Sequence, residues 1–176
     1  FTGDLFSPRR PSGSPPGFDW PLVGINEALD SSERMLVQQL ASCSAVLARG
    51  TGQLPAVRCN YGTGILPTVF GADLFVMDAE LNTLPTAMPL GTGEISIEAC
   101  LERGVPDIRT GLGAKVFETA ERFLEWTESY PRVRRYVTLY HPDLQGPMAV
   151  CELPWGSSLS LAIVDHPATV KAFLAP

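Results

Sequence analysis

The sequence predicts an α/β fold in which right-handed β/α units surround a parallel sheet. Two observations lead to this prediction. Long segments with apolar residues at helical spacing alternate with short runs of β-branched and other apolar residues. One of these short runs, 137–140, is followed within five residues by His141, Asp143 and Gln145. Polar groups gathered where a strand ends are typical of functional sites in α/β proteins.

The first expected element is a helix over 30–49. Asp30 and Glu33 form a capping-box-like start, apolar residues recur on one face, and Gly50 supplies the stop. A short strand is expected at 54–60. It ends in turn-forming residues that reach Gly64 and precede an apolar stretch to Phe70.

The middle of the chain alternates in the same way. We expect a strand at 72–77, an irregular connection at 82–93, a short helix at 94–103 closed by Gly104, and a long helix at 112–130 ended by Pro131. The apolar stripe of the long helix is expected to be core, and it comprises Val116, Phe117, Ala120, Phe123, Leu124 and Thr127.

The last third begins with a strand that starts at Tyr136. After the polar loop, a helix is expected at 152–164, with Pro154 in its first turn. A final helix is expected to start at 165–167, with Pro167 near its first position.

Composition narrows the class of protein. The chain has 176 residues, of which 45% are hydrophobic and 18% charged, and its net charge is −6. Nucleic acid is not an expected partner because phosphate binding needs clustered basic residues. The one basic cluster, at 132–135, is interpreted as a solvated helix end.

The cysteine pattern and the ends of the chain indicate the compartment and the domain limits. The four cysteines show no CxxC pairing, and we identify neither a signal peptide nor an apolar run of membrane length. We therefore expect a cytoplasmic protein with no membrane partner. Residues 1–19 are predicted to be a flexible leader rich in Pro, Ser and Gly, and 20–176 the folded domain.

The residues alone place a candidate site where two strands end on a shared rim. Its members are Arg58, Asn60 and Tyr61 after one strand and His141, Asp143 and Gln145 after the other. Arg58 could clamp a carboxylate, and Asn60 and Tyr61 could hydrogen-bond a polar substrate. His141 and Asp143 could act as a general acid–base pair near neutral pH.

Each of these residues has a structural alternative. Arg58 could pair with an acid of the sheet, and Asp143 could cap backbone amides in a Pro-Asp turn. Glu152 is a further candidate for substrate binding, whereas the Gly62-Thr63-Gly64 segment is a weak candidate for an anion cradle. No metal ligand set is evident.

Several segments together resemble the uroporphyrinogen decarboxylase superfamily over roughly 26–174. They are ILPTVFGADLFV at 65–76, TLPTAMPL at 83–90, VTLYHPDLQGPMAVCELPWGS at 137–157 and DHPATVKAFL at 165–174. The resemblance implies the N-terminal part of a (β/α)8 TIM barrel, incomplete in this chain because such a barrel needs about 250 residues.

The sequence also departs from the decarboxylase pattern. Tyr61 or Gly62 stands where the decarboxylases carry an aspartate for the pyrrole nitrogens, and Glu152 or Leu153 stands where they carry a tyrosine. The arginine-rich loop that takes substrate carboxylates has no counterpart at 17–30. These departures argue against uroporphyrinogen itself as the substrate.

The resemblance implies decarboxylase or corrinoid-dependent methyltransferase chemistry on a carboxylated or tetrapyrrole-related small molecule. Zinc or corrinoid would be expected only if a second half of the barrel supplied the methyltransferase ligands, since His141 has no cysteine two residues on. We expect the chain to be a fragment of such an enzyme. The alternative is a truncated, non-catalytic relative that forms a homo-oligomer or binds a complementary chain that completes the barrel.

Overall fold

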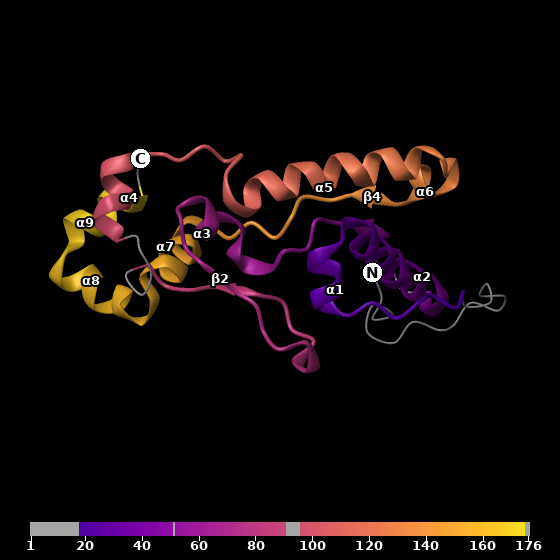
Figure 1. Cartoon of the computed structure of the whole chain (residues 1–176), viewed down its shortest axis with the longest axis horizontal. Coiled ribbons are helices and arrows are strands. Elements are labelled where there is room, and N and C mark those ends of the chain that lie inside the picture. Colours follow the sequence, from indigo (N-terminus) through magenta and orange to yellow (C-terminus); the bar gives the residue numbers. More distant parts are fainter. Residues whose placement is uncertain (1–17, 51, 91–95, 175–176) are drawn as a thin grey trace. The chain divides into compact units, whose positions relative to one another are not determined.

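The computed structural model describes residues 18–50, 52–90 and 96–174 (Figure 1). The predicted leader therefore lies outside the described residues except for Phe18 and Asp19. The chain divides into two units, one formed by the residues up to Cys59 together with Thr119–His141, the other by Asn60–Glu118 together with the residues from Pro142 onward. Each unit is described in turn.

The first unit contains a parallel β/α arrangement. Its elements are α1 (Ile25–Asp30), α2 (Ser32–Arg49), β1 (Ala56–Val57), the second half of α5 (Gly111–Glu128), α6 (Pro131–Tyr136) and β4 (Thr138–Leu139). Strands β1 and β4 pair in parallel, with Ala56 opposite Thr138 and Val57 opposite Leu139. Both strands are much shorter than the sequence predicts, and α5, α6 and the preceding residues form the connection between them.

Helix α2 confirms the predicted helix and its stop but not its predicted first residue. Gly50 ends the helix at φ 66° and ψ 30°, a left-handed conformation that glycine adopts readily. The N-cap, however, is Ser31, whose Oγ accepts a hydrogen bond from Arg34 N at 3.3 Å. Asp30 instead closes α1, because a separate short helix precedes α2.

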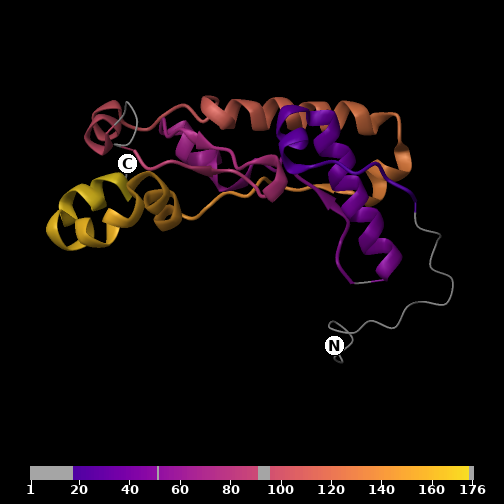
Figure 2. The same ribbon diagram turned by 60° about the horizontal axis from the view of Figure 1, so that its bottom comes forward.

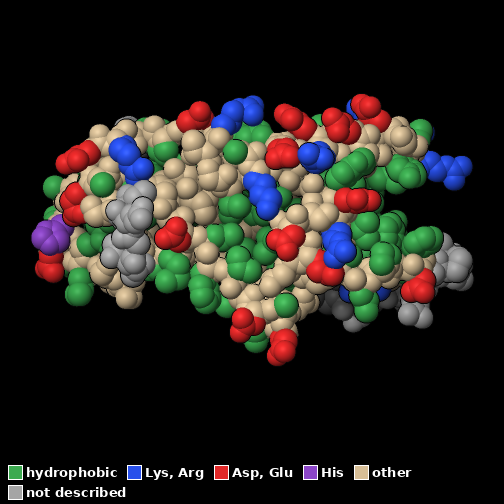
Figure 3. All heavy atoms as spheres, viewed as in Figure 1, with side chains coloured by type: hydrophobic (Ala, Val, Ile, Leu, Met, Phe, Trp, Pro, Cys, Tyr) green, Lys and Arg blue, Asp and Glu red, His purple; other side chains and the backbone are tan. Residues whose placement is uncertain are grey.

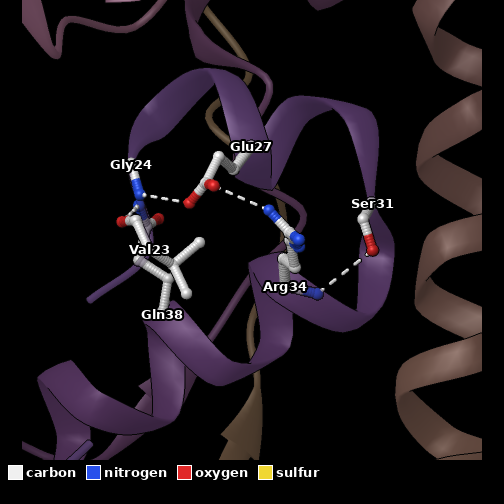
Figure 4. A network of polar contacts seen from close by, with 6 residues as sticks. All are labelled: Val23, Gly24, Glu27, Ser31, Arg34 and Gln38. Carbon is white, nitrogen blue, oxygen red and sulfur yellow. Dashed lines mark hydrogen bonds and ion pairs between the residues drawn. The ribbon is translucent and has the colours of Figure 1, made fainter. Parts of the chain in front are cut away.

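Polar contacts connect α1 to α2 (Figure 4). Glu27 accepts one hydrogen bond from Gly24 N at 3.2 Å and another from Arg34 Nη1 at 2.7 Å. Gln38 Nε2 donates to Val23 O at 2.9 Å. The contacts of Arg34 and Gln38 hold the start of α1 against the first two turns of α2.

The second unit contains an antiparallel hairpin and most of the short helices. Its elements are η1 (Gly62–Gly64), α3 (Ile65–Val69), β2 (Leu74–Phe75), η2 (Ala79–Leu81), β3 (Thr86–Ala87), α4 (Ile97–Arg103), the first half of α5, α7 (Pro147–Trp155), η3 (Gly156–Ser158), α8 (Leu159–Asp165) and α9 (Pro167–Leu174). In the described residues, the strands form only the parallel pair of the first unit and this hairpin, without a closed barrel.

The hairpin corrects the prediction of an irregular connection over 82–93. Leu74 lies opposite Ala87 and Phe75 opposite Thr86, and Met88 N donates to Asp73 O at 2.8 Å. The prolines at 85 and 89 flank β3 and so remove no donor from its two paired residues. The part of the predicted connection at 91–93 lies outside the described residues.

Helix α5 is amphipathic, although part of its predicted core stripe is wrong. Phe123 is buried, as expected, but Leu124 is 45% exposed and Thr119 is buried in its place. Its start is capped by Thr68, whose Oγ1 accepts from Leu112 N at 3.0 Å. Helix α5 ends at Glu128, two residues before its predicted end. Pro131 begins α6, so the predicted strand start at Tyr136 is helical.

The C-terminal helices form a small core of their own, and Figures 1 and 2 both show them beside one another in yellow. It consists of Cys151, Leu159, Ala162 and Val170, with Trp155, Phe173 and Leu174 packed against it. Pro154 lies near the end of α7, not in a first turn, because α7 begins at Pro147. Helix α9 starts at Pro167, as predicted.

The helical stretch Pro147–Asp165 is long and apolar enough to cross a membrane by length and composition alone. It is not one continuous helix. Helix α7 ends at Gly156, which has φ 66° and ψ −156°, and η3 separates it from α8. Cys151 and Leu159, on either side of this break, are buried in the same core, whereas Leu161 and Val164 on α8 are exposed.

Candidate functional site

The parallel pairing of β1 with β4 places the ends of the two predicted strands next to each other in the first unit. Thr138 N donates to Pro55 O at 3.1 Å, and Tyr140 N donates to Val57 O at 2.8 Å. The second bond extends the pairing one residue beyond β4. Arg58 and His141 directly follow this paired segment.

The two residues differ in burial and in register. Arg58 is half-buried and stands between the buried residues Val57 and Cys59. Because side chains alternate along extended chain, continuing the register sets Arg58 opposite Tyr140 and Cys59 opposite His141. The strand ends share one edge, but in this register the side chains of Arg58 and His141 leave opposite faces of the paired strands, so a molecule that contacts both must reach around this edge.

His141 is exposed and stacks on its neighbour Tyr140. The ring centroids are 3.9 Å apart, at an interplanar angle of 36°. Tyr140 is itself 52% exposed. The contact restricts the imidazole orientation while leaving it accessible to a small molecule or to water, as a proton-transfer group requires.

The remaining predicted residues belong to the second unit, since the unit boundaries fall after Cys59 and after His141. Asn60 is half-buried, and Tyr61 is only 1% exposed. Lys115 Nζ lies 5.1 Å from the centroid of the Tyr61 ring, in a cation–π contact. Sequence reasoning missed Lys115 because nothing in the helical pattern of α5 distinguishes it from other exposed cations.

The glycines after Tyr61 are needed for close packing. Gly62 has φ +71°, and a Cβ there would collide with Pro85 O. A Cβ on Gly64 would lie 2.7 Å from Leu74 Cδ1. Both glycines therefore let η1 approach the β2–β3 hairpin more closely than other residues allow.

The three candidate residues that follow His141 differ in their local structure. Asp143 is half-buried at the centre of a tight turn in which Leu144 N donates to Pro142 O at 2.9 Å. Gln145 precedes Gly146, the N-cap of α7. Glu152 is exposed on α7 and does not lie at a strand end.

The four cysteines are all free and buried. Burial raises the pKa of the Cys59 thiol to about 11 and also raises the pKa of Cys43 and Cys151. These three thiols are therefore protonated near neutral pH and unsuited to act as thiolate nucleophiles. In the described residues, no group of three or more His, Cys, Asp or Glu is placed to hold a metal ion.

Comparison of the chain with models of protein families, with curated proteins and with solved structures found no match. The chemistry that can be argued for this chain therefore rests on its own residues. These supply a guanidinium and an accessible imidazole at the edge of a parallel pair, and a buried tyrosine beneath an ammonium group in the second unit.

Proposed function

We propose that this chain supplies part of the active site of an enzyme of the uroporphyrinogen decarboxylase type. The substrate is a carboxylated or tetrapyrrole-related small molecule, and the reaction is decarboxylation or methyl transfer. The observation that carries the proposal is the parallel pairing of β1 with β4. Functional groups in β/α folds gather at the carboxyl ends of parallel strands, where Arg58 and His141 stand.

Arg58 would bind a substrate carboxylate. A guanidinium is charged at any physiological pH and presents paired N–H groups that match a carboxylate. The half-buried position of Arg58 supports this role because partial exclusion of water strengthens a charge-assisted hydrogen bond.

His141 would transfer the proton. When a carboxylate leaves as CO₂, the electron pair remains on carbon, and a positioned acid must deliver a proton there. His141 is exposed and restricted by its stacking on Tyr140, so it is accessible to the substrate without being freely mobile.

The test compares coproporphyrin, a tetrapyrrole with four carboxylates, with its tetramethyl ester, using fluorescence titration of the purified protein. We expect the acid to bind and Arg58→Gln to weaken its binding about tenfold or more without affecting the ester. Arg132→Gln is the matched control, since Arg132 is exposed on α6. Equal binding of acid and ester, or equal effects of the two substitutions, would contradict the proposal.

The role of His141 is tested by release of CO₂ from pentacarboxyl porphyrinogen, because its one acetate side chain adjoins a pyrrole ring that can hold the electron pair until a proton arrives. His141→Gln should reduce the rate while leaving coproporphyrin affinity unchanged, because the imidazole moves a proton and does not bind the carboxylate. His166→Gln is the control, as His166 is the other histidine and is exposed at the start of α9. If the substitutions affect turnover equally, His141 has no special role.

The two-stranded parallel sheet favours a second candidate function. Parallel sheets are normally covered and extended by further strands, and an open edge readily pairs with another chain. The chain would then be a non-catalytic subunit whose sheet edge binds a complementary chain or a second copy. Sedimentation that shows an assembly, together with no binding of coproporphyrin, would favour this candidate over the enzyme.

A further inference from the structure

The first unit contains a cavity that takes no part in the proposed active site. Its volume is about 650 Å³, within the range of small-molecule sites. Helix α2 contributes Leu36 and Leu40, α5 contributes Trp126, and α6 contributes Val133. In Figure 3, hydrophobic side chains lie on both sides of the notch at the right-hand edge, where Figure 1 places α6 and α2.

The walls of this cavity are rich in aromatic rings. Trp20, Trp126 and Tyr130 all line it. Phe18 packs edge-on against Trp20, with ring centroids 5.1 Å apart, and holds the indole in place. Such walls suit a flat ring, which stacks on them, and a cation, which is attracted to their faces.

Two kinds of polar group accompany the rings. The Nε1 atom of Trp20 is buried and has no hydrogen-bond partner in the described part of the chain. A buried donor without an acceptor is unfavourable, and an acceptor on a ligand would satisfy it. The charged lining residues of the cavity are Glu33 and Glu125, so its charge favours a cationic ligand.

We infer that this cavity binds a small aromatic ammonium compound that carries a carbonyl or similar acceptor. The aromatic ring lies among Trp20, Trp126 and Tyr130, the acceptor takes the hydrogen bond from Trp20 Nε1, and the ammonium group faces the carboxylates of Glu33 and Glu125. This ligand differs in charge from the carboxylated substrate proposed for the strand ends, so the two sites can be tested separately.

The test uses tryptophan fluorescence in a Trp155→Phe background. The chain has three tryptophans, and this substitution leaves only the two that line the cavity. The probes are phenylalaninamide, which has ring, ammonium and carbonyl, phenethylamine, which lacks the carbonyl, and glycinamide, which lacks the ring. We expect saturable fluorescence changes with the two aromatic amines. The affinity should be highest for phenylalaninamide, lower for phenethylamine and lowest for glycinamide.

Two substitutions assign the polar contacts. Trp20→Phe retains an aromatic ring but removes the N–H. It should weaken the binding of phenylalaninamide about fivefold and barely change the binding of phenethylamine. Glu125→Gln should weaken the binding of both aromatic amines about two- to fivefold. Glu121→Gln is the charge-matched control, since Glu121 lies one turn earlier on α5 and does not line the cavity.

Three outcomes would overturn the inference. One is the absence of a saturable change with phenylalaninamide. Another is an equal effect of Glu125→Gln and Glu121→Gln, which would indicate general electrostatics and no specific contact. The third is a dimer in sedimentation whose dissociation alone exposes the tryptophans, because a second copy would then cover the cavity.

Discussion

The backbone N–H of Tyr140 donates a hydrogen bond to the carbonyl of Val57 at 2.8 Å, and this bond joins the ends of two strands that lie far apart in the sequence. It continues the parallel register of β1 and β4 and brings the positions after both strands to one edge. The proposed roles of Arg58 and His141 depend on this pairing more than on any other contact of the first unit.

Amide hydrogen exchange tests the pairing directly. The amides of Thr138 and Tyr140 donate to β1 and should exchange slowly, whereas the amide of Leu139 points away from β1 and should exchange quickly. Residue-resolved exchange followed by NMR measures all three. Fast exchange at Thr138 and Tyr140 would refute the parallel pairing, and slow exchange at Leu139 would show that another strand covers the outer edge.

Gly62→Ala should destabilise the protein by about 2–4 kcal/mol. The substitution places a Cβ at φ +71°, against Pro85 O, so backbone strain and a steric clash act together. Gly104→Ala is the control because Gly104 has nearly the same φ, +72°, with no atom within 4 Å of its Cβ position. It should cost about 1–2 kcal/mol in urea unfolding. Equal losses would mean that η1 does not pack closely on the hairpin.

Ser31→Ala should lower the free energy of unfolding by about 1 kcal/mol because it removes the N-cap of α2. Asp30→Ala should change it by less than about 0.5 kcal/mol, since Asp30 is exposed and caps no helix start. Urea unfolding of both variants measures the difference. A larger loss from Asp30→Ala would restore Asp30 as the cap that sequence reasoning predicts.

Thr68→Val should destabilise the second unit by about 1 kcal/mol. The hydroxyl accepts from Leu112 N at the start of α5 and donates to Ile65 O at 2.8 Å, and valine keeps the shape while losing both bonds. Thr138→Val, at an exposed strand position, is the control and should be neutral or slightly stabilising. Thermal unfolding followed by circular dichroism compares the two.

Stability should fall between about pH 9 and pH 11, in part because of Cys59. Its folded pKa of about 11 lies above the ordinary value of 9.0, so the unfolded chain loses this proton first as the pH rises. The contribution of Cys59 is thus complete below pH 9 and is lost as the pH rises toward 11. Cys59→Ala should lower the number of protons released on unfolding by about one, so the free energy of unfolding should decline less steeply with pH. An unchanged slope in urea unfolding would show that Cys59 is not buried.

Three helix ends could be predicted from sequence, and the polar loop could be predicted only in part. Gly50, Gly104 and Pro167 end or begin helices as expected, because each signal acts within one helical turn. The cap at Ser31 was missed since two adjacent residues, Asp30 and Ser31, are both good caps. Asp143 occupies a tight turn, which sequence reasoning kept open beside its catalytic role.

The sequence by itself determined where α2, α4, α5 and α9 form, because apolar periodicity and the residues at helix ends are local properties of the chain. Only the tertiary structure decided the parallel register of β1 with β4, the β2–β3 hairpin and the cation–π contact of Lys115 with Tyr61. These features join residues distant in sequence, and their free energy comes from the hydrogen bonds and close contacts that exist only once the segments meet.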